Sequence, residues 1–425
     1  MKASELKKVI LEGALEKYSN LYTDTEAQKK RFLAALDSYI ELYGDESDGV
    51  GIFSVPGRSE ISGNHTDHNR GCVLAGAIDR DIIAVAAKNT DGVIRFKSEG
   101  YPKTEIDLSA IDEPANFENY TSDSLIAGLA KGFVNESYSI GGYDAYATTE
   151  VLKGSGISSS AAFEVMIGNI FNYLYNDGKV SNVTIAKLSQ FAENVYFGKP
   201  CGLMDQMACA VGGFVYIDFE SPSDPIVDPI SFSLTDAGYS LAIVNTGGNH
   251  ADLNDDYASV PSEMKAVATE FGRDVLRGLT EADVISKIPQ LREKLGDRAV
   301  LRALHFVREN NRVTKIRDAL KNSDVKAFLD GVLESGSSSF KYLQNVFTTI
   351  NVKEQGLSLA LALTEGYLAG KDCAYRVHGG GFAGTIQVFI KNEYIGGFTA
   401  LMDSVFGEGA TMNLKIRPVG ACRLF

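Results

Sequence analysis

The chain has 425 residues, enough for two or three domains, and its 44% hydrophobic and 23% charged residues are ordinary for a soluble globular protein. Its 55 acidic and 41 basic residues give a formal charge of −14, which disfavours nucleic acid and anionic membranes as partners. No apolar run is long enough to cross a bilayer. Five scattered cysteines without a CxxC pair are typical of a reducing compartment, so we expect a cytoplasmic protein.

Residues 3–43 carry helical periodicity in two blocks, which predicts two helices joined near residues 20–25. A strand is predicted to start at Gly51, and a polar segment at 56–71 follows it. Burying charged side chains between apolar elements costs free energy unless each charge is paired or binds a ligand. The segment is therefore either a solvated loop or a pocket for a sugar, whose hydroxyls need charged and amide partners at fixed positions.

Zinc is disfavoured in this polar segment. His65, Asp67 and His68 could be metal ligands by residue type, but no further soft ligand stands at a spacing characteristic of zinc.

The segment 154–162 lies between a predicted strand at 143–151 and a predicted helix at 163–174. Its glycines let the backbone approach a ligand, and the start of a helix offers unpaired N–H groups to an anion. Serine hydroxyls add donors and a hard oxygen suited to Mg²⁺. An ordinary helix N-cap is the alternative, but three serines after Gly-x-Gly favour phosphate binding. The pattern is neither a Walker loop nor a dinucleotide fingerprint.

Two further stretches combine small residues with polar ones. A helix predicted over 182–197 carries Glu193 and leads to a small-residue segment that holds Asp205, which is either a helix N-cap or a functional carboxylate. Near the end of the chain, three glycines at 379–381 precede a predicted strand at 385–390. They indicate either a tight turn or close approach of the backbone to a ligand.

A proline-rich stretch at 221–225 is the best candidate for a linker. We therefore predict two domains, residues 1–225 and 226–425. Beyond the linker, a strand is predicted at 239–245, and helical patterns dominate residues 260–375.

Five segments in this order resemble the galactokinase branch of the GHMP small-molecule kinases. Residues 57–71 resemble the family signature G-R-x-N-L-I-G-E-H-T-D-Y-N-x-G, and residues 154–164 resemble the phosphate loop G-x-G-L-S-S-S-A-x-x-E. Residues 201–206 resemble C-G-I-M-D-Q, and residues 376–384 resemble R-x-T-G-G-G-F-G-G. The segment from 245 to Tyr257 resembles D-T-G-x-x-H with its following sugar-contacting Tyr. Each motif alone is weak, but the ordered set is specific and spans the chain from about residue 30 to its last residue.

The resemblance implies an α+β protein with the two-domain GHMP kinase fold: an N-terminal α+β domain, a ferredoxin-like C-terminal domain and substrates between them. It implies an ATP- and Mg²⁺-dependent sugar 1-kinase, with galactose as the first candidate. Galacturonate, N-acetylgalactosamine or a related sugar is the second candidate, and a non-catalytic sugar and ATP sensor of the same fold is the third. The implied partners are the sugar and ATP alone, on a monomer or weak oligomer.

The resemblance also implies roles for individual residues. Arg58 and Asp205 fall on the family's catalytic pair, and Glu193 with the hydroxyl of Ser159 or Ser160 falls on its Mg²⁺ ligands. The implied phosphate-binding residues are Gly154, Ser155, Gly156, Ser158, Ser159 and Ser160. The implied sugar-binding residues are Glu60, Asn64, His65, Asp67, Gly202 and Tyr257.

One departure from the family signature bears on the choice of sugar. Asn64 stands where the family has Glu, and Glu60 stands where it has Asn, so an amide and a carboxylate have exchanged places. Positions i and i+4 of a strand share a face, so Glu60 is a candidate to replace the lost carboxylate. Otherwise Asn64 would offer two N–H donors to the sixth carbon of the sugar and would reject a uronate less strongly. His378 in place of Thr and Ala383 in place of Gly are further departures.

Overall fold

The computed structural model describes residues 1–152, 156–248 and 253–425, and these fall into two compact units. Unit 1 consists of Met1–Arg58, Ala77–Gly213 and Arg417–Phe425, whereas unit 2 consists of Ser59–Gly76 and Phe214–Ile416. The units are not two continuous stretches such as 1–225 and 226–425, because strands β1 and β2 each contribute residues to both.

Unit 1 is built on a sheet with the strand order β12-β1-β2-β5-β3-β4, in which β3 and β5 pair in parallel and β2 pairs antiparallel with β5. The bounds of its elements are α1 Ala3–Leu11, α2 Thr25–Tyr43, β1 Gly51–Ser62, β2 Cys72–Lys88, β3 Val93–Ser98, β4 Lys103–Asp107, α3 Ser122–Asn135, β5 Tyr143–Thr149, α4 Ser159–Tyr175, α5 Asn182–Phe191, α6 Met204–Val211 and β12 Cys422–Arg423.

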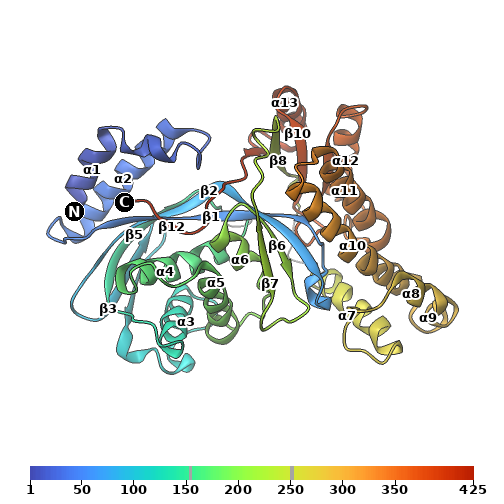
Figure 1. The fold of residues 1–425 in the computed structure, drawn as a ribbon, viewed down its shortest axis with the longest axis horizontal. Coiled ribbons are helices and arrows are strands. Elements are labelled where there is room, and N and C mark those ends of the chain that lie inside the picture. The colour runs from blue at the N-terminus through green and yellow to red at the C-terminus, as the bar shows by residue number, and fades with distance from the viewer. Residues whose placement is uncertain (153–155, 249–252) are drawn as a thin grey trace. The chain divides into compact units, whose positions relative to one another are not determined.

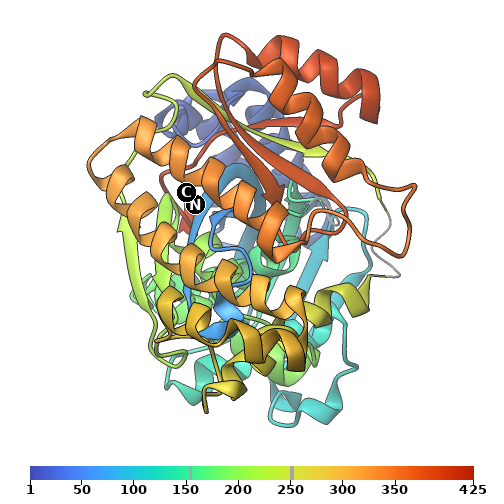
Figure 2. The same ribbon diagram turned by 90° about the vertical axis from the view of Figure 1, so that its right-hand side faces the viewer.

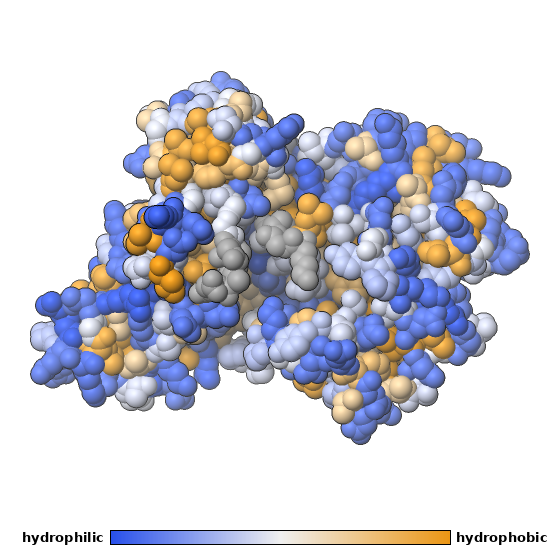
Figure 3. All heavy atoms as spheres, turned by 180° about the vertical axis from the view of Figure 1, so that it is seen from behind, coloured by the Kyte–Doolittle hydropathy of each residue, from blue (hydrophilic) through white to orange (hydrophobic). Residues whose placement is uncertain are grey.

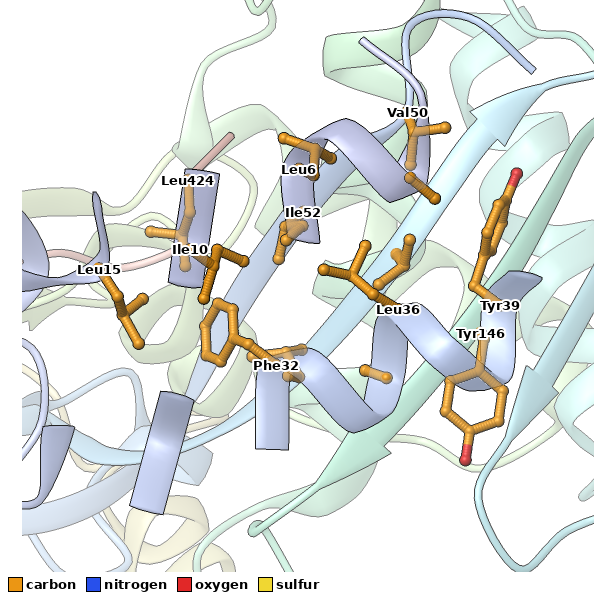
Figure 4. Packing of buried hydrophobic residues seen from close by; sticks show 14 of the residues in the cluster. Leu6, Ile10, Leu15, Phe32, Leu36, Tyr39, Val50, Ile52, Tyr146 and Leu424 are labelled. Carbon is orange, nitrogen blue, oxygen red and sulfur yellow. The ribbon is translucent and has the colours of Figure 1, made fainter. Parts of the chain in front are cut away.

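Helices α1 and α2 cover one face of this sheet, while α3 to α6 lie on the other face (Figure 1). The apolar stripe of α2 supplies Phe32, Leu36 and Tyr39, which pack against Ile52 of β1 and Tyr146 of β5 (Figure 4). Each fully buried side chain of this size contributes about 1.5–3 kcal/mol through removal of apolar surface from water. The two predicted N-terminal helices therefore form part of the core of unit 1.

A buried ion cluster fixes β2 to the rest of unit 1. The Asp81 carboxylate accepts hydrogen bonds from Arg31 of α2 (2.7 Å), Arg417 (3.0 Å) and the hydroxyl of Tyr22 (2.8 Å). Burial alone would raise the pKa of Asp81, but the charges of the two arginines lower it below its ordinary value. This pairing lets β2 run without a break through a polar segment that separates two apolar runs in the sequence.

Unit 2 contains an antiparallel sheet with the order β11-β8-β10-β9, and β6 pairs with the start of β2 and with β7. Helices α12 and α13, drawn in orange-red in Figure 2, pack on the apolar side of the four-stranded sheet. The bounds are β6 Phe214–Asp218, β7 Ile226–Ile230, β8 Tyr239–Asn245, α7 Asn254–Glu270, α8 Glu281–Ser286, α9 Ile288–Leu295, α10 Asp297–Lys321, α11 Val325–Ser338, α12 Gly356–Tyr367, β9 Ala374–His378, β10 Thr385–Lys391, α13 Ile395–Phe406 and β11 Thr411–Leu414.

The structure differs from the sequence prediction mainly in element lengths. Strand β1 continues to Ser62. It therefore includes the first part of the polar segment that was predicted to be a solvated loop or a sugar pocket. Within the region where helical patterns dominate, residues 281–295 form two helices, α8 and α9, with a break at Lys287 just before Pro289. The strand predicted at 239–245 is confirmed as β8.

Within the described residues, no helix is both long and apolar enough to cross a membrane. The face drawn in Figure 3 is mostly hydrophilic with scattered hydrophobic side chains, in keeping with the acidic composition.

Candidate functional site

Arg58 and Asp205 form a bidentate ion pair in unit 1. The Nε and Nη2 atoms of Arg58 donate to the two carboxylate oxygens of Asp205 at 2.8 Å and 3.0 Å. Arg58 lies in β1 and Asp205 lies in the first turn of α6, so a strand and a helix from distant parts of the sequence fix the pair. Fork-to-fork contact of this kind sets both the position and the orientation of the carboxylate.

The same pair is tied to the segment predicted to bind phosphate. Arg58 Nη1 donates to the carbonyl of Gly156 at 2.7 Å, and the Ser158 hydroxyl donates to Asp205 Oδ2 at 2.5 Å. Ser158 has φ +63°, a left-handed conformation that non-glycine residues adopt rarely, and α4 begins at the next residue. The structure thus joins Arg58, Asp205, Gly156 and Ser158 in one hydrogen-bonded assembly. Ser159 and Ser160 form the first turn of α4, whereas Gly154 and Ser155 lie outside the described residues.

The alternative that Asp205 is a helix N-cap is wrong. Leu203 occupies the N-cap position of α6 with no side-chain cap, and the carboxylate of Asp205 points to Arg58 and Ser158 instead. Burial would raise the pKa of Asp205, but the charge of Arg58 and the hydrogen bonds from Arg58 and Ser158 lower it below its ordinary value. Asp205 is therefore ionised at neutral pH.

Glu193 lies at the start of a π-helical turn, Ala192–Phe197, that extends α5. Such turns are rare and are frequent at functional sites. The Glu193 side chain is 3% exposed, and its Oε1 faces the ammonium of Lys199 at 3.3 Å, while its Oε2 accepts from the amide of Gln206 at 2.8 Å. Glu193 thus has one carboxylate oxygen in a position that attracts positive charge, here that of Lys199, and a carboxylate oxygen is the kind of donor that Mg²⁺ takes.

The donors available near Glu193 suit Mg²⁺ better than a metal held by protein alone. Within the described residues, no group of three or more His, Cys, Asp or Glu side chains gathers as a metal site. Mg²⁺ is ordinarily held by one or two carboxylates, with waters and substrate phosphates completing its shell.

Glu164 is a second buried carboxylate close to Glu193. It lies on α4, is fully buried, and its Oε2 accepts from the same Gln206 amide at 3.0 Å. Burial and the charge of Glu193 raise the pKa of Glu164 well above its ordinary value. Gln206 therefore bridges two carboxylates that would otherwise repel each other.

Unit 1 also contains a cavity of about 480 Å³ whose walls are largely apolar and aromatic. Ser159 and Ser160 stand at its edge, beside the start of α4. The aromatic residues that line it are Phe96, Tyr101, Tyr120, Phe163 and Phe197. Tyr101 and Tyr120 are more than half exposed, so their rings are open to a planar ligand. Sequence reasoning missed these residues because they come from separate segments without a common motif.

In unit 2, the sugar-site residues predicted at 64–65 and 257 converge on the glycine turn at 379–381. Asn64 donates to the carbonyl of Gly379 (2.7 Å), a ring nitrogen of His65 lies 2.9 Å from the carbonyl of Gly380, and the Tyr257 hydroxyl donates to the carbonyl of Gly381 (2.8 Å). An added Cβ at Gly380 would meet the Tyr257 ring at 2.7 Å. These glycines form a tight turn that side chains of the protein approach closely, and the alternative of close approach to a ligand stays a prediction.

The amide of Asn64 is saturated by protein groups, unlike the expectation that it offers two N–H donors to a ligand. Its nitrogen donates to Glu60 Oε1 (3.0 Å) and to a backbone carbonyl, and its oxygen accepts from Asn345 (2.7 Å) and Ser339 (3.3 Å). Asn64 is 1% exposed. The exchanged amide and carboxylate are thus hydrogen-bonded partners.

His65 and Asp67 flank the backbone turn that follows β1. His65 has φ +58°, and Asp67 begins a 3₁₀ turn with its carboxylate 3.8 Å from the ring of His68. Burial lowers the pKa of His65 to about 4, against the opposing effects of the Gly380 carbonyl and Asp67, so the ring is neutral at pH 7. Asp67 is partly exposed in unit 2, and Gly202 is exposed in the loop before α6 in unit 1.

Helix α10 contacts the turn that follows β1, and the sequence did not predict this contact. The ring of His305 lies 3.0 Å from the Asn64 carbonyl, and Glu309 accepts from the backbone N–H of Gly63 at 3.0 Å. Both side chains are fully buried. A histidine and a glutamate four residues apart on one helix were a signal, but only the fold shows what they contact.

Comparison with known proteins identifies relatives along most of the chain. Residues 37–88 match the family model described as galactokinase galactose-binding signature, and residues 124–213 match that of the GHMP kinases N terminal domain. Galactokinase of Streptomyces coelicolor is 31% identical over 376 residues, covering 87% of this chain and 92% of that protein. Galactokinase of Actinobacillus pleuropneumoniae serotype 3 is 31% identical over 369 residues, covering 85% and 90%.

Two solved structures share the fold. Lactococcus lactis galactokinase complexed with galactose superposes with a TM-score of 0.75 at 22% identity, covering 92% of this chain and 99% of that one. Methanococcus jannaschii mevalonate kinase superposes with a TM-score of 0.60 at 12% identity, covering 87% and 98%.

Proposed function

The chain belongs to the galactokinase family of the GHMP kinases, and on that premise we propose that it transfers the γ-phosphoryl group of ATP to the anomeric hydroxyl of galactose. The products are α-galactose 1-phosphate and ADP. The predicted membership and the predicted GHMP kinase fold are confirmed. The observation that carries the proposal is the hydrogen-bonded assembly of Arg58, Asp205 and Ser158 beside the start of α4.

Asp205 and Arg58 act on the reacting groups. Phosphoryl transfer requires that the attacking hydroxyl be positioned, that its proton be accepted and that developing charge be stabilised. An ionised Asp205 orients the sugar hydroxyl and accepts its proton. Arg58 fixes the orientation of that carboxylate and places a permanent positive charge beside the transferring group.

Unit 1 provides for the nucleotide. Glu193 and the hydroxyl of Ser159 or Ser160 would hold Mg²⁺, which when bound neutralises charge on the phosphates of ATP. Gly154, Ser155, Gly156 and the three serines are the proposed phosphate contacts. The apolar cavity beside Ser159 is the proposed adenosine pocket, because its aromatic walls suit a planar base.

Unit 2 provides for the sugar, and Gly202 of unit 1 is a further proposed contact. His65, Asp67, Tyr257 and Glu60 are the proposed contacts, with Asn64 holding Glu60 in place. The carboxylate of Glu60 pairs with the buried Arg376 at 3.4 Å but would still repel a second carboxylate at close range, so we expect the pocket to favour galactose over galacturonate. The cytoplasmic location and the monomeric or weakly oligomeric state stay predictions from the sequence.

The experiment that tests this proposal is an ADP-release assay with a panel of hexoses, N-acetylhexosamines and uronic acids. Galactose should give the highest kcat/KM, with the phosphate on the anomeric oxygen by ³¹P NMR. Binding of galactose and ATP without ADP release would favour the sensor alternative, and a preference for galacturonate would show that Glu60 does not face the sixth carbon.

A further inference from the structure

Gln206 stands between the two buried carboxylates of unit 1 and contacts both. Its Nε2 donates to Glu193 Oε2 at 2.8 Å and to Glu164 Oε2 at 3.0 Å. Gln206, Glu164 and Glu193 are all buried, with exposed fractions of 1%, 0% and 3%. Both N–H bonds of one amide are therefore used to hold two acidic side chains apart at fixed positions.

The remaining oxygens show which carboxylate can reach a ligand. Within the described part of the chain, Gln206 Oε1 and Glu164 Oε1 have no hydrogen-bond partner. Glu193 Oε1, in contrast, faces the ammonium of Lys199, a side chain that is 58% exposed. Of the two carboxylates, Glu193 therefore has an oxygen that contacts a cationic side chain open to solvent, while Glu164 is closed inside the unit.

Two consecutive residues of α6 connect the contacts of Gln206 to the proposed reacting groups. Asp205, which pairs with Arg58, and Gln206, which holds Glu193, are consecutive residues in the first turn of α6. Cys201, in the loop before the same helix, also contacts this group, because its Sγ accepts from Gln206 Nε2 at 3.6 Å. A single helix start thus sets the orientation of both the proposed base and the proposed metal carboxylate.

We propose that Gln206 is a positioning residue for the cation site: its amide fixes Glu193 Oε2 so that Glu193 Oε1 is directed to the cation, and Glu164 anchors the amide from the opposite side. The inference rests on the proposed function, in which Glu193 holds Mg²⁺. Hydrogen bonds that orient ligating carboxylates commonly change metal affinity when they are lost, by about 10–100-fold.

The test uses the full chain and measures ATP binding by calorimetry as a function of Mg²⁺ concentration, without sugar. Gln206→Met keeps the side-chain length but removes both N–H donors, and Gln206→Glu keeps the shape but replaces the donors with a third carboxylate. Both variants should raise the Mg²⁺ concentration for half-maximal ATP affinity by about 10–100-fold. ATP affinity in EDTA and galactose affinity should stay within twofold of wild type, which a role only in folding would not preserve.

Two further variants complete the design. Glu164→Gln retains an oxygen acceptor for the Gln206 amide and should keep the wild-type Mg²⁺ dependence, whereas Glu164→Leu removes that anchor and should raise the Mg²⁺ requirement. Glu193→Gln is the reference that reports on the metal assignment itself. If Glu193→Gln changes the Mg²⁺ dependence of ATP binding but the Gln206 variants do not, the positioning role alone is overturned. If Glu193→Gln leaves the Mg²⁺ dependence unchanged, the metal assignment of the proposed function is overturned. Loss of metal-free ATP binding in both Gln206 variants also overturns the positioning role.

Discussion

The functional groups of the two units are held by different kinds of interaction. In unit 1 the charged candidate residues are paired with opposite charges: Arg58 with Asp205, and Glu193 with Lys199. In unit 2 the uncharged sugar candidates Asn64, His65 and Tyr257 contact backbone carbonyls of the glycine turn, whereas Glu60 pairs with Arg376 at 3.4 Å.

This difference matches the two chemical tasks. Stabilising a phosphoryl group in transfer requires charges that are already oriented before the reaction. Recognising the hydroxyls of a sugar requires donors and acceptors in fixed directions, and rigid uncharged neighbours provide these without adding charge. The comparison predicts that substitutions in unit 1 act mainly on kcat and the cation, and those in unit 2 mainly on the KM for sugar.

The largest effect is expected for Asp205→Asn. The amide cannot accept the proton of the sugar hydroxyl and breaks the charge pair with Arg58, so kcat should fall by about 10²–10⁴-fold. ATP affinity should change less than about twofold, because the amide oxygen of the variant can still accept the hydrogen bond from Ser158 at the start of α4. Steady-state kinetics and calorimetry measure the two quantities.

A matched control for this substitution is available in unit 2. Asp218 forms the same bidentate contact, at 2.8 Å and 3.0 Å, with Arg277, and no site function is proposed for that pair. Asp218→Asn should leave kcat near its wild-type value. Equal losses of kcat in both variants would mean that Asp205 contributes through folding alone.

The exchange of amide and carboxylate gives the next largest effect. Asn64→Glu places a second carboxylate where Glu60 now has a hydrogen-bond donor 3.0 Å away. Like-charge contact in such a buried place costs several kcal/mol, so the KM for galactose should rise by roughly 100-fold. The reversed pair, Glu60→Asn with Asn64→Glu, restores one amide and one carboxylate and should recover most of the loss.

The same variants report on the sixth carbon of the sugar. The ratio of kcat/KM for galactose and galacturonate should differ between Asn64→Glu and wild type. If the ratio is unchanged in the single and double variants, neither residue 60 nor residue 64 reads that carbon.

A smaller effect is expected for Tyr257→Phe, which removes the hydrogen bond to the Gly381 carbonyl. One such bond contributes about 0.5–1.5 kcal/mol, so the KM for galactose should rise roughly 3–10-fold with kcat nearly constant. Tyr216→Phe, which removes a hydroxyl that donates to the Cys72 thiol in the same unit, is the matched control and should leave the KM unchanged. A fall in kcat with constant KM would contradict a role for Tyr257 in sugar binding.

The smallest effect concerns pH. The pKa of His65 is lowered to about 4, whereas an exposed histidine titrates near pH 6.5. His65 stays neutral from pH 6 to 8 and should cause no change in the KM for galactose there. Below about pH 6.5 the unfolded chain binds a proton that the folded chain does not, so the free energy of unfolding falls as the pH drops toward 4.

His65→Gln should lessen that fall by an amount on the order of 1 kcal/mol between pH 7 and 5. Urea unfolding at the two pH values measures it. Part of the pH dependence should persist in the variant, since burial also lowers the pKa of His305. Identical pH dependence in wild type and variant would show that His65 is not held neutral by the fold.

The sequence predicts candidate site residues where a motif lies within a short segment, and it predicts helices where the apolar residues have a strong periodicity. The helices around Phe32 and at the start of α4 have clear apolar stripes, and the spacing around Asp205 matches a known signature. The role of Asn64 was not predictable, because its partner Asn345 comes from a segment far along the chain.

Long-range pairing also explains why the sequence did not predict that strand β1 continues to Ser62. The polar residues of β1 read as a loop until Arg58 is seen to pair with Asp205 and Ser59 to lie 3.1 Å from a ring nitrogen of His378. The five aromatic residues of the cavity beside Ser159 share no spacing, so only their positions in the sheet and helices bring them together.

Unit 1 is made of three separate segments of the chain, and this has a consequence for its synthesis. Strand β12 pairs with β1, and Arg417 neutralises the buried Asp81, so residues 417–423 are needed before the sheet of unit 1 is complete. These residues leave the ribosome after all of unit 2 has been made. Until then, the edge of β1 lacks a partner and Asp81 lacks one of its two arginines, so the nascent chain exposes a strand edge of the kind through which incomplete chains aggregate.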